Sequence, residues 1–224
     1  MPADQGQPQP YRDRRHAGAE LAGHLDAFSS RSDVVVLALP RGGVPVAYEV
    51  ARALHAPLDV FVVRKLGVPG HRELAMDAIA SGGVRVLNDD VVAWYGIPDA
   101  VIDEVGREEQ VELERRERQY REGRPAVDVR GRVVLLIDDG LATGSTMKAA
   151  VQAIRAHAPS QVIVAVPVGS PETCRQLTTI ADTVVCARSP EHLAAVGRWY
   201  REFSQTSDDE VRQLLQASSD AAHD

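Results

Sequence analysis

The chain has 224 residues, 44% of them hydrophobic and 25% charged, which suits one globular domain with an elaboration. Its formal charge of −7 argues against broad binding to nucleic acids or anionic membranes, because such binding depends on a basic surface. Aromatic residues make up only 4%, which argues against a platform for stacking bases. We therefore expect neither a nucleic acid nor a membrane as a partner.

The beginning of the chain and its cysteines indicate the compartment. Residues 1–10 are polar and rich in Pro and Gln, so we expect a disordered tail without the features of a signal peptide. No apolar run approaches the roughly 20 residues of a membrane span. Cys174 and Cys186 lack the spacing of a metal site, and nothing points to an oxidising environment, so free thiols are expected. The predicted location is cytoplasmic.

Short apolar runs alternate with segments of helical character along the chain. The first helix is indicated by the spacing of Leu21, Leu25 and Phe28. Strands are predicted at residues 34–39, 60–63, 84–87, 133–137, 161–166 and 183–187. Helices are predicted at residues 12–28, 45–54, 99–122, 145–157, 171–179 and within 190–217. The polar stretch 66–76, which contains Gly and Pro, is predicted to be a mobile loop.

Strands that are apolar on both faces and alternate with helices predict an α/β fold with a parallel sheet of about five strands flanked by helices. We expect a single domain over residues 11–224, with its core at 30–90 and 130–190. A helical insertion or hood is expected at 97–123, and a helical C-terminal region at 190–217. The alternating charges of the insertion favour a solvated helix over a nucleic-acid-binding arm.

Residues 133–146 (VVLLIDDGLATGST) carry the most chemical information. A buried strand would deliver Asp138 and Asp139 to the carboxyl edge of the sheet, where open α/β sheets bind ligands. The small residues that follow allow a tight loop whose backbone N–H groups face one anion. The N-terminus of the next helix adds further unpaired N–H groups. The segment therefore predicts a phosphate cradle.

Two carboxylates beside such a cradle would repel a phosphate unless other groups used them. Sugar hydroxyls donate to carboxylates, and Mg²⁺ offsets their charge directly or through its waters. The segment lacks the Gly-Lys-Ser/Thr of a Walker A motif, and no strand is followed by G-x-G-x-x-G. A phosphorylated sugar with free hydroxyls, bound together with a metal, is the ligand that these residues favour.

This segment resembles the 5-phosphoribosyl-1-pyrophosphate (PRPP) signature of the type I phosphoribosyltransferase superfamily. The resemblance implies that Asp138 and Asp139 hold the ribose 2- and 3-hydroxyls. It also implies that a loop wraps the 5-phosphate, made of Ala142, Thr143, Gly144, Ser145 and Thr146. No direct protein ligand to the metal is expected, because Mg²⁺ would be held mainly by PRPP and water near the two aspartates.

A second loop, Arg41-Gly42-Gly43, follows the first core strand, where the family binds pyrophosphate. By itself this tripeptide also fits a simple turn. Arg41 and Lys65 are candidates for contacting the leaving group, although the end of the strand at Lys65 could equally be a solvated one. The 66–76 stretch corresponds to the family's closing loop, which makes His71 and Glu73 catalytic candidates beside the acidic pair and the two cations.

Further motifs resemble an uncharacterised branch of predicted phosphoribosyltransferases: Y-R-D-R at 11–14, L-P-R-G-G-V-P-V-A at 39–47, V-R-K-L-G at 63–67 and V-G-R-W-Y-R-E-F at 196–203. Members of that branch sometimes carry a fused hydrolase-type domain, which we do not expect here. Asp77 stands where Gly is expected, which leaves its role open. The resemblance also favours a homodimer.

The resemblance implies transfer of the phosphoribosyl group of PRPP to a nitrogenous acceptor, with Mg²⁺ and release of pyrophosphate. Ala142 replaces the aspartate typical of 6-oxopurine transferases, and the sequence does not name the acceptor. The acceptor is expected to meet a hood made of the N-terminal and 99–122 helices, and the loop at 167–172. A non-catalytic PRPP sensor and an enzyme that uses water as acceptor remain open alternatives.

Overall fold

The main sheet has five parallel strands in the order β2-β1-β6-β7-β8. Its strands are β1 (Val34–Ala38), β2 (Leu58–Val60), β6 (Val133–Ile137), β7 (Gln161–Val168) and β8 (Thr183–Arg188). The computed structural model describes residues 9–68, 71–87 and 89–221, without the side chains of 68–76 and 89–90. The predicted parallel α/β sheet is confirmed.

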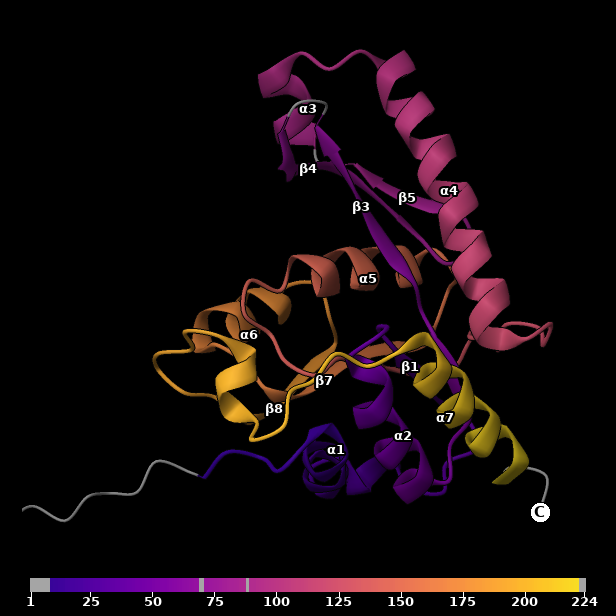
Figure 1. The fold of residues 1–224 in the computed structure, drawn as a ribbon, viewed down its shortest axis with the longest axis vertical. Coiled ribbons are helices and arrows are strands. Elements are labelled where there is room, and N and C mark those ends of the chain that lie inside the picture. Colours follow the sequence, from indigo (N-terminus) through magenta and orange to yellow (C-terminus); the bar gives the residue numbers. More distant parts are fainter. Residues whose placement is uncertain (1–8, 69–70, 88, 222–224) are drawn as a thin grey trace, which may run out of the picture.

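Helices cover both faces of this sheet (Figure 1). One face carries α1 (Arg14–Gly23), α2 (Gly43–Leu54) and α7 (Asp208–Ala221), and the other carries α5 (Ser145–Arg155) and α6 (Pro171–Leu177). Val34 and Val36 of β1 belong to the first core, whereas Val35 and Leu37 belong to the second. Successive side chains of a strand point to opposite faces, so a strand buried on both faces must be apolar throughout.

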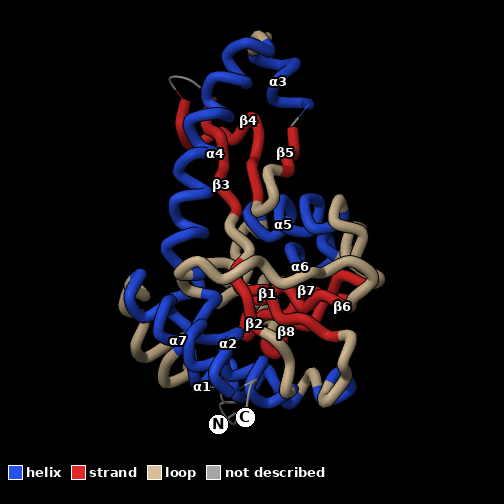
Figure 2. The backbone as a smooth tube through the Cα atoms, turned by 90° about the vertical axis from the view of Figure 1, so that its right-hand side faces the viewer, coloured by secondary structure: helices blue, strands red, loops and turns tan. Residues whose placement is uncertain are grey.

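A second sheet is antiparallel and follows β2 directly in the chain (Figure 2). It consists of β3 (Val63–Val68), β4 (His71–Ala80) and β5 (Val84–Leu87), and it is followed by α3 (Asp89–Tyr95) and α4 (Asp99–Arg121). Helix α5 lies between the two sheets and contacts strands of both (Figure 1). The insertion into the parallel core therefore begins at Val63 and includes a sheet as well as the expected helix.

Two segments correct the predictions. The stretch expected as a loop at 66–76 is largely strand, because β3 and β4 pair as a hairpin with irregular register around Gly67. Gly67 thus marks an irregularity in the pairing of β3 with β4 rather than the start of a long loop, and Pro69 and Gly70 lie outside the described residues. The segment 190–207, expected to be helical, has only the short 3₁₀ turn Val196–Trp199, and helix α7 begins at Asp208. Tyr200 instead bridges to Tyr11 and packs with it.

The two ends of the described chain and the cysteines add smaller corrections. Residues 1–8 of the expected tail lie outside the described residues, but the Gln9 carbonyl accepts a hydrogen bond from Arg188 at 2.6 Å. Cys174 and Cys186 form a disulfide that joins α6 to β8, so the expectation of free thiols is wrong. Within the described ranges, no helix is both long enough and apolar enough to cross a membrane.

Candidate functional site

The acidic pair lies at the carboxyl end of β6, next to the loop that follows β1. The Asp139 N–H donates to Asp138 Oδ1 at 2.8 Å. A Cβ added to Gly43 would lie 2.7 Å from the Ile137 carbonyl oxygen, and one added to Gly42 would overlap with the Asp139 carboxylate. Only glycine allows this approach. The structure therefore brings both predicted elements, the acidic pair and the Gly42-Gly43 loop, to one place.

Burial disfavours the doubly ionised form of the acidic pair. It raises the pKa of Asp138 well above its usual range, and the neighbouring Asp139 charge raises that pKa further. Burial also raises the pKa of Asp139, while a hydrogen bond and the charge of Arg14 act in the opposite direction. A site of this kind favours a ligand or cation that compensates the second charge.

The predicted phosphate loop leads into the N-terminus of α5. Gly144 has φ +68°, and a Cβ there would overlap with the Thr173 methyl group. The Thr173 hydroxyl donates to the Ala142 carbonyl at 2.6 Å, which fixes the loop from the side of α6. The side chains of Thr143 and Ser145 are exposed, and no described side chain caps the helix at Gly144. The first N–H groups of α5 are thus available to an anion.

The two candidate cations point to different places. Lys65, on β3, donates to the Ser145 hydroxyl and so lies at the phosphate loop. Arg41 Nη1 lies 3.7 Å from Asp208 Oδ1, at the start of α7. The sequence suggested that both would reach the pyrophosphate. The structure places Lys65 with Ser145 and Arg41 with Asp208.

Residues near both termini contact the acidic pair, and none of them is among the site residues predicted from the sequence. Arg14 Nε donates to Asp139 Oδ2 at 2.8 Å, and Arg14 Nη1 donates to the Ser204 carbonyl at 2.7 Å. The Tyr200 hydroxyl donates to the Asp139 carbonyl at 2.6 Å, and Phe203 stacks on Tyr200. These residues belong to the Y-R-D-R and W-Y-R-E-F motifs, which resemble the family branch but did not themselves indicate a role.

A family model of the phosphoribosyl transferase domain matches residues 13–192. The chain belongs to this family. It is 51% identical over 213 residues to a Mycobacterium tuberculosis protein named "Putative phosphoribosyl transferase Rv0571c", a match that covers 95% of this chain and 47% of that protein. The chain thus spans about half the length of the curated relatives it matches.

A solved structure shares the same architecture. The crystal structure of TT1426 from Thermus thermophilus is 41% identical in sequence, with a TM-score of 0.82. The match covers 93% of this chain and 99% of TT1426. The likeness therefore extends over nearly the whole chain.

The remaining candidates lie in the second sheet. His71 and Glu73 belong to β4, and their side chains are outside the described part of the structure. Asp77 is buried in the same strand and accepts from Arg85 Nε at 2.9 Å, and Arg85 also pairs with Asp103 at 2.8 Å. The unexpected aspartate is therefore neutralised within the insertion.

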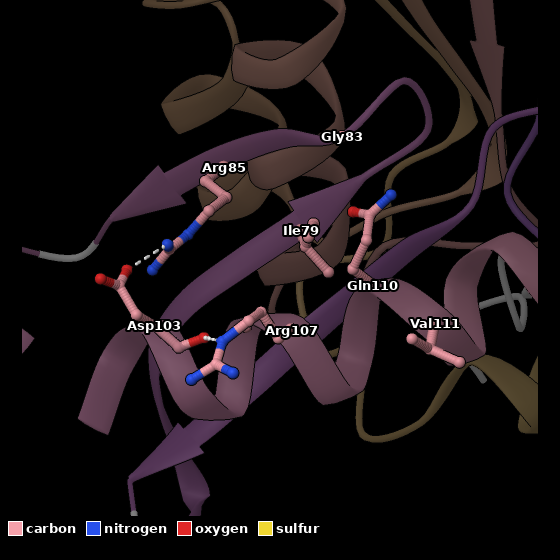
Figure 3. Close-up of a pocket in the computed structure, with 8 residues that line it drawn as sticks. Ile79, Gly83, Arg85, Asp103, Arg107, Gln110 and Val111 are labelled. Atoms are coloured by element: carbon pink, nitrogen blue, oxygen red, sulfur yellow. Dashed lines mark hydrogen bonds and ion pairs between the residues drawn. The ribbon is translucent and has the colours of Figure 1, made fainter. Parts of the chain in front are cut away.

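A cleft of about 680 Å³ lies between this sheet and α4 (Figure 3). Its lining consists of Ile79, Gly83, Arg85, Asp103, Gly106, Arg107, Gln110 and Val111. The dashed contacts in the figure tie Arg85 to Asp103 and Arg107 to the Asp103 carbonyl. None of the residues predicted for the phosphoribosyl transferase site lines this cleft, so it is separate from that site.

Proposed function

We propose that this chain transfers the 5-phosphoribosyl group of PRPP to a nitrogenous acceptor and releases pyrophosphate. The observation that carries the proposal is the direct contact between the acidic pair and the Gly42-Gly43 loop, with the open N-terminus of α5 on the same sheet edge. Two anion-binding loops on either side of hydroxyl-accepting carboxylates fit a ribose that is phosphorylated at both ends.

Each element has a role in this reaction. Asp138 and Asp139 accept hydrogen bonds from the ribose hydroxyls and orient the sugar. The loop from Ala142 to Thr146 binds the 5-phosphate, and Lys65 supplies a positive charge beside Ser145. The acceptor nitrogen forms a bond to the anomeric carbon while the bond to pyrophosphate breaks, with its electron pair leaving on the phosphate oxygen. The protein contributes mainly orientation and electrostatic stabilisation.

The donors at the site fit Mg²⁺ that arrives with the ligand. Within the described residues, no group of three or more His, Cys, Asp or Glu is arranged to hold a metal. Mg²⁺ commonly keeps several waters and binds one or two carboxylates together with substrate phosphates. Asp138 and Asp139 would hold those waters, and the ion would neutralise the pyrophosphate.

The position of the acceptor is proposed from the elements that lie at the acidic pair, one of which is the expected N-terminal helix, α1. Helix α4 packs on β3 and β4, whereas the segment 196–204 and α1 lie at the acidic pair. The acceptor therefore meets residues of α1 and of the C-terminal segment. Ala142 at the start of the phosphate loop provides no carboxylate for a 6-oxopurine, so we propose an acceptor of another kind.

The test is a calorimetric titration with PRPP, with and without Mg²⁺, of the wild type and of the double variant Asp138→Asn/Asp139→Asn. We expect Mg²⁺-dependent binding that the double variant loses. Asp33→Asn is the control, because this exposed carboxylate lies next to the opposite end of β1 and should leave binding unchanged. Equal affinity of wild type and double variant would refute the assignment.

Phosphorus NMR then follows pyrophosphate release from PRPP with a panel of nucleobases and with water alone. Release that depends on one base names the acceptor, and release without any base indicates hydrolysis. Tight binding without release under all these conditions would contradict the transferase and favour a PRPP sensor.

A further inference from the structure

Arg14 is held at the acidic pair by three separate groups. Its Nε bonds to Asp139 Oδ2, its Nη1 bonds to the Ser204 carbonyl, and its guanidinium carbon lies 3.9 Å from the centre of the Phe203 ring. Only 11% of its side chain is exposed. A guanidinium fixed on three sides has lost most of its conformational freedom before any ligand binds, so little entropy remains to be lost on binding.

The same guanidinium borders the loop assigned to pyrophosphate. A Cβ added to Gly42 would lie 3.3 Å from Arg14 Nε, so the two residues are immediate neighbours. Arg14 Nη2 has no hydrogen-bond partner among the described residues, while Nε and Nη1 are both occupied. The guanidinium has five N–H donors in a fixed plane. Those on Nη2 therefore remain for a ligand.

The side chains of the two cations suggested by the sequence have other partners. Arg41 is directed at Asp208, and Lys65 is bonded to Ser145 of the phosphate loop. Arg14 is the cation that the structure places beside both Asp139 and Gly42. We propose that Arg14, positioned by Asp139, Ser204 and Phe203, contacts the pyrophosphate leaving group. This inference rests on the proposed function.

The chemical role is electrostatic. When the bond between the anomeric carbon and the phosphate oxygen breaks, the electron pair stays on the departing pyrophosphate. A guanidinium that is already in place stabilises the developing charge without transferring a proton. Arg14 also pairs with Asp139, the carboxylate that orients the ribose. The same cation would therefore contact both this carboxylate and the departing pyrophosphate.

The test separates the two halves of the ligand. Pyrophosphate and ribose 5-phosphate, each with Mg²⁺, are titrated calorimetrically into the wild type, Arg14→Gln and Arg14→Lys. We expect Arg14→Gln to bind pyrophosphate at least about tenfold more weakly, which is the effect of losing one charge-assisted contact. Its affinity for ribose 5-phosphate should fall clearly less. Arg14→Lys should recover part of the loss, since it keeps the charge without the planar fork.

Arg15→Gln is the matched control on the same helix. Arg15 is half exposed and pairs with Glu49, which keeps Arg52 as a second partner. This variant should bind both probes as the wild type does. Circular dichroism of all variants checks that they fold. If Arg14→Gln does not fold, the affinities for pyrophosphate and ribose 5-phosphate are compared with those of Arg14→Lys instead.

Three outcomes decide the matter. A selective loss of pyrophosphate affinity in Arg14→Gln, with partial rescue by lysine, supports the proposal. An equal loss of both probes overturns it, because Arg14 would then act only through Asp139. A wild type that binds neither probe nor PRPP refutes the proposed function itself, so the two failures remain distinguishable.

Discussion

At the scale of single residues, the burial of Asp138 has a cost in stability. Its pKa in the folded chain is raised, first by burial and then by the charge of Asp139. A carboxyl whose folded-state pKa is raised contributes stability below its unfolded value, and that contribution is lost as the pH rises through the folded value. The ionised pair therefore destabilises the ligand-free protein at neutral pH.

Asp138→Asn should consequently be more stable than the wild type at pH 7.5, by a few degrees in Tm, while it binds PRPP poorly. The gain should shrink as the pH falls toward 4, because the wild-type carboxyl then becomes neutral. Thermal melts across this pH range measure it. Asp33→Asn should show no gain, since its partner Arg31 lowers the pKa of that exposed carboxyl. A less stable Asp138→Asn at pH 7.5 would contradict this account.

Thr173 is a second residue whose effect is measurable. Its buried hydroxyl donates to the Ala142 carbonyl and accepts from Ser170 Oγ at 2.8 Å. Thr173→Val keeps the shape of the side chain but leaves the Ala142 carbonyl without this donor. The loss should destabilise the observed conformation of the phosphate loop by about 1–2 kcal/mol. We expect ribose 5-phosphate to bind roughly tenfold more weakly, because 1.4 kcal/mol is a factor of ten.

Thr173→Ser is the control for that substitution, since it retains the hydroxyl and should keep most of the affinity for ribose 5-phosphate. Calorimetry with this ligand and Mg²⁺ gives the comparison. If the valine and serine variants bind equally, the hydroxyl does not hold the phosphate loop.

At the scale of elements, the insertion depends on the pair between β4 and β5. Asp77 has no exposed side-chain area, whereas its partner Arg85 is one-third exposed. Arg85→Met should lower the free energy of unfolding by about 1–3 kcal/mol, because the change leaves the buried Asp77 charge uncompensated. The effect should be smaller than for a fully buried pair, since Arg85 is partly exposed to solvent.

A double-mutant cycle tests this pair. Asp77→Asn combined with Arg85→Met should recover part of the loss, since the buried charge is then gone. Urea denaturation of the four proteins provides the free energies of unfolding. Additive effects of the two substitutions would show that the pair is not coupled.

The elements of the parallel core could be predicted from sequence because their strands are apolar on both faces. Residues 133–137 are predicted and observed as the same strand, β6. The half-polar strands β3 and β4 have no such signal, and Gly67 favoured a loop interpretation. Asp138, Asp139 and the phosphate loop follow from a local motif. Arg14 reaches Asp139 across 125 positions of the chain, a contact that local spacing does not reveal.

At the scale of the whole molecule, two buried tyrosines connect peripheral segments to the rest. The Tyr11 hydroxyl donates to the Pro167 carbonyl at 2.9 Å, and the Tyr120 hydroxyl joins α4 to Asp208 at the start of α7. Burial raises the pKa of Tyr11 to about 12. Burial and then the bond to Asp208 raise the pKa of Tyr120 to about 12 as well.

The stability that these two groups provide is complete below pH 10 and is lost as the pH rises from about 10 to about 12. We expect alkaline unfolding in this window, with tyrosinate absorbance and loss of helical circular dichroism rising together. In Tyr120→Phe, the free energy of unfolding should decrease less steeply with pH across this window. Ionisation of both tyrosines near pH 10 in an intact fold would be inconsistent with this view.

The contact of Arg14 with both Asp139 and the Ser204 carbonyl also has a consequence for biosynthesis. Residue 204 leaves the ribosome long after β6 and the acidic pair have emerged, so a nascent chain can form its parallel sheet while this closure is still missing. Ligand affinity should therefore be acquired late in translation, as a step separate from the formation of the core.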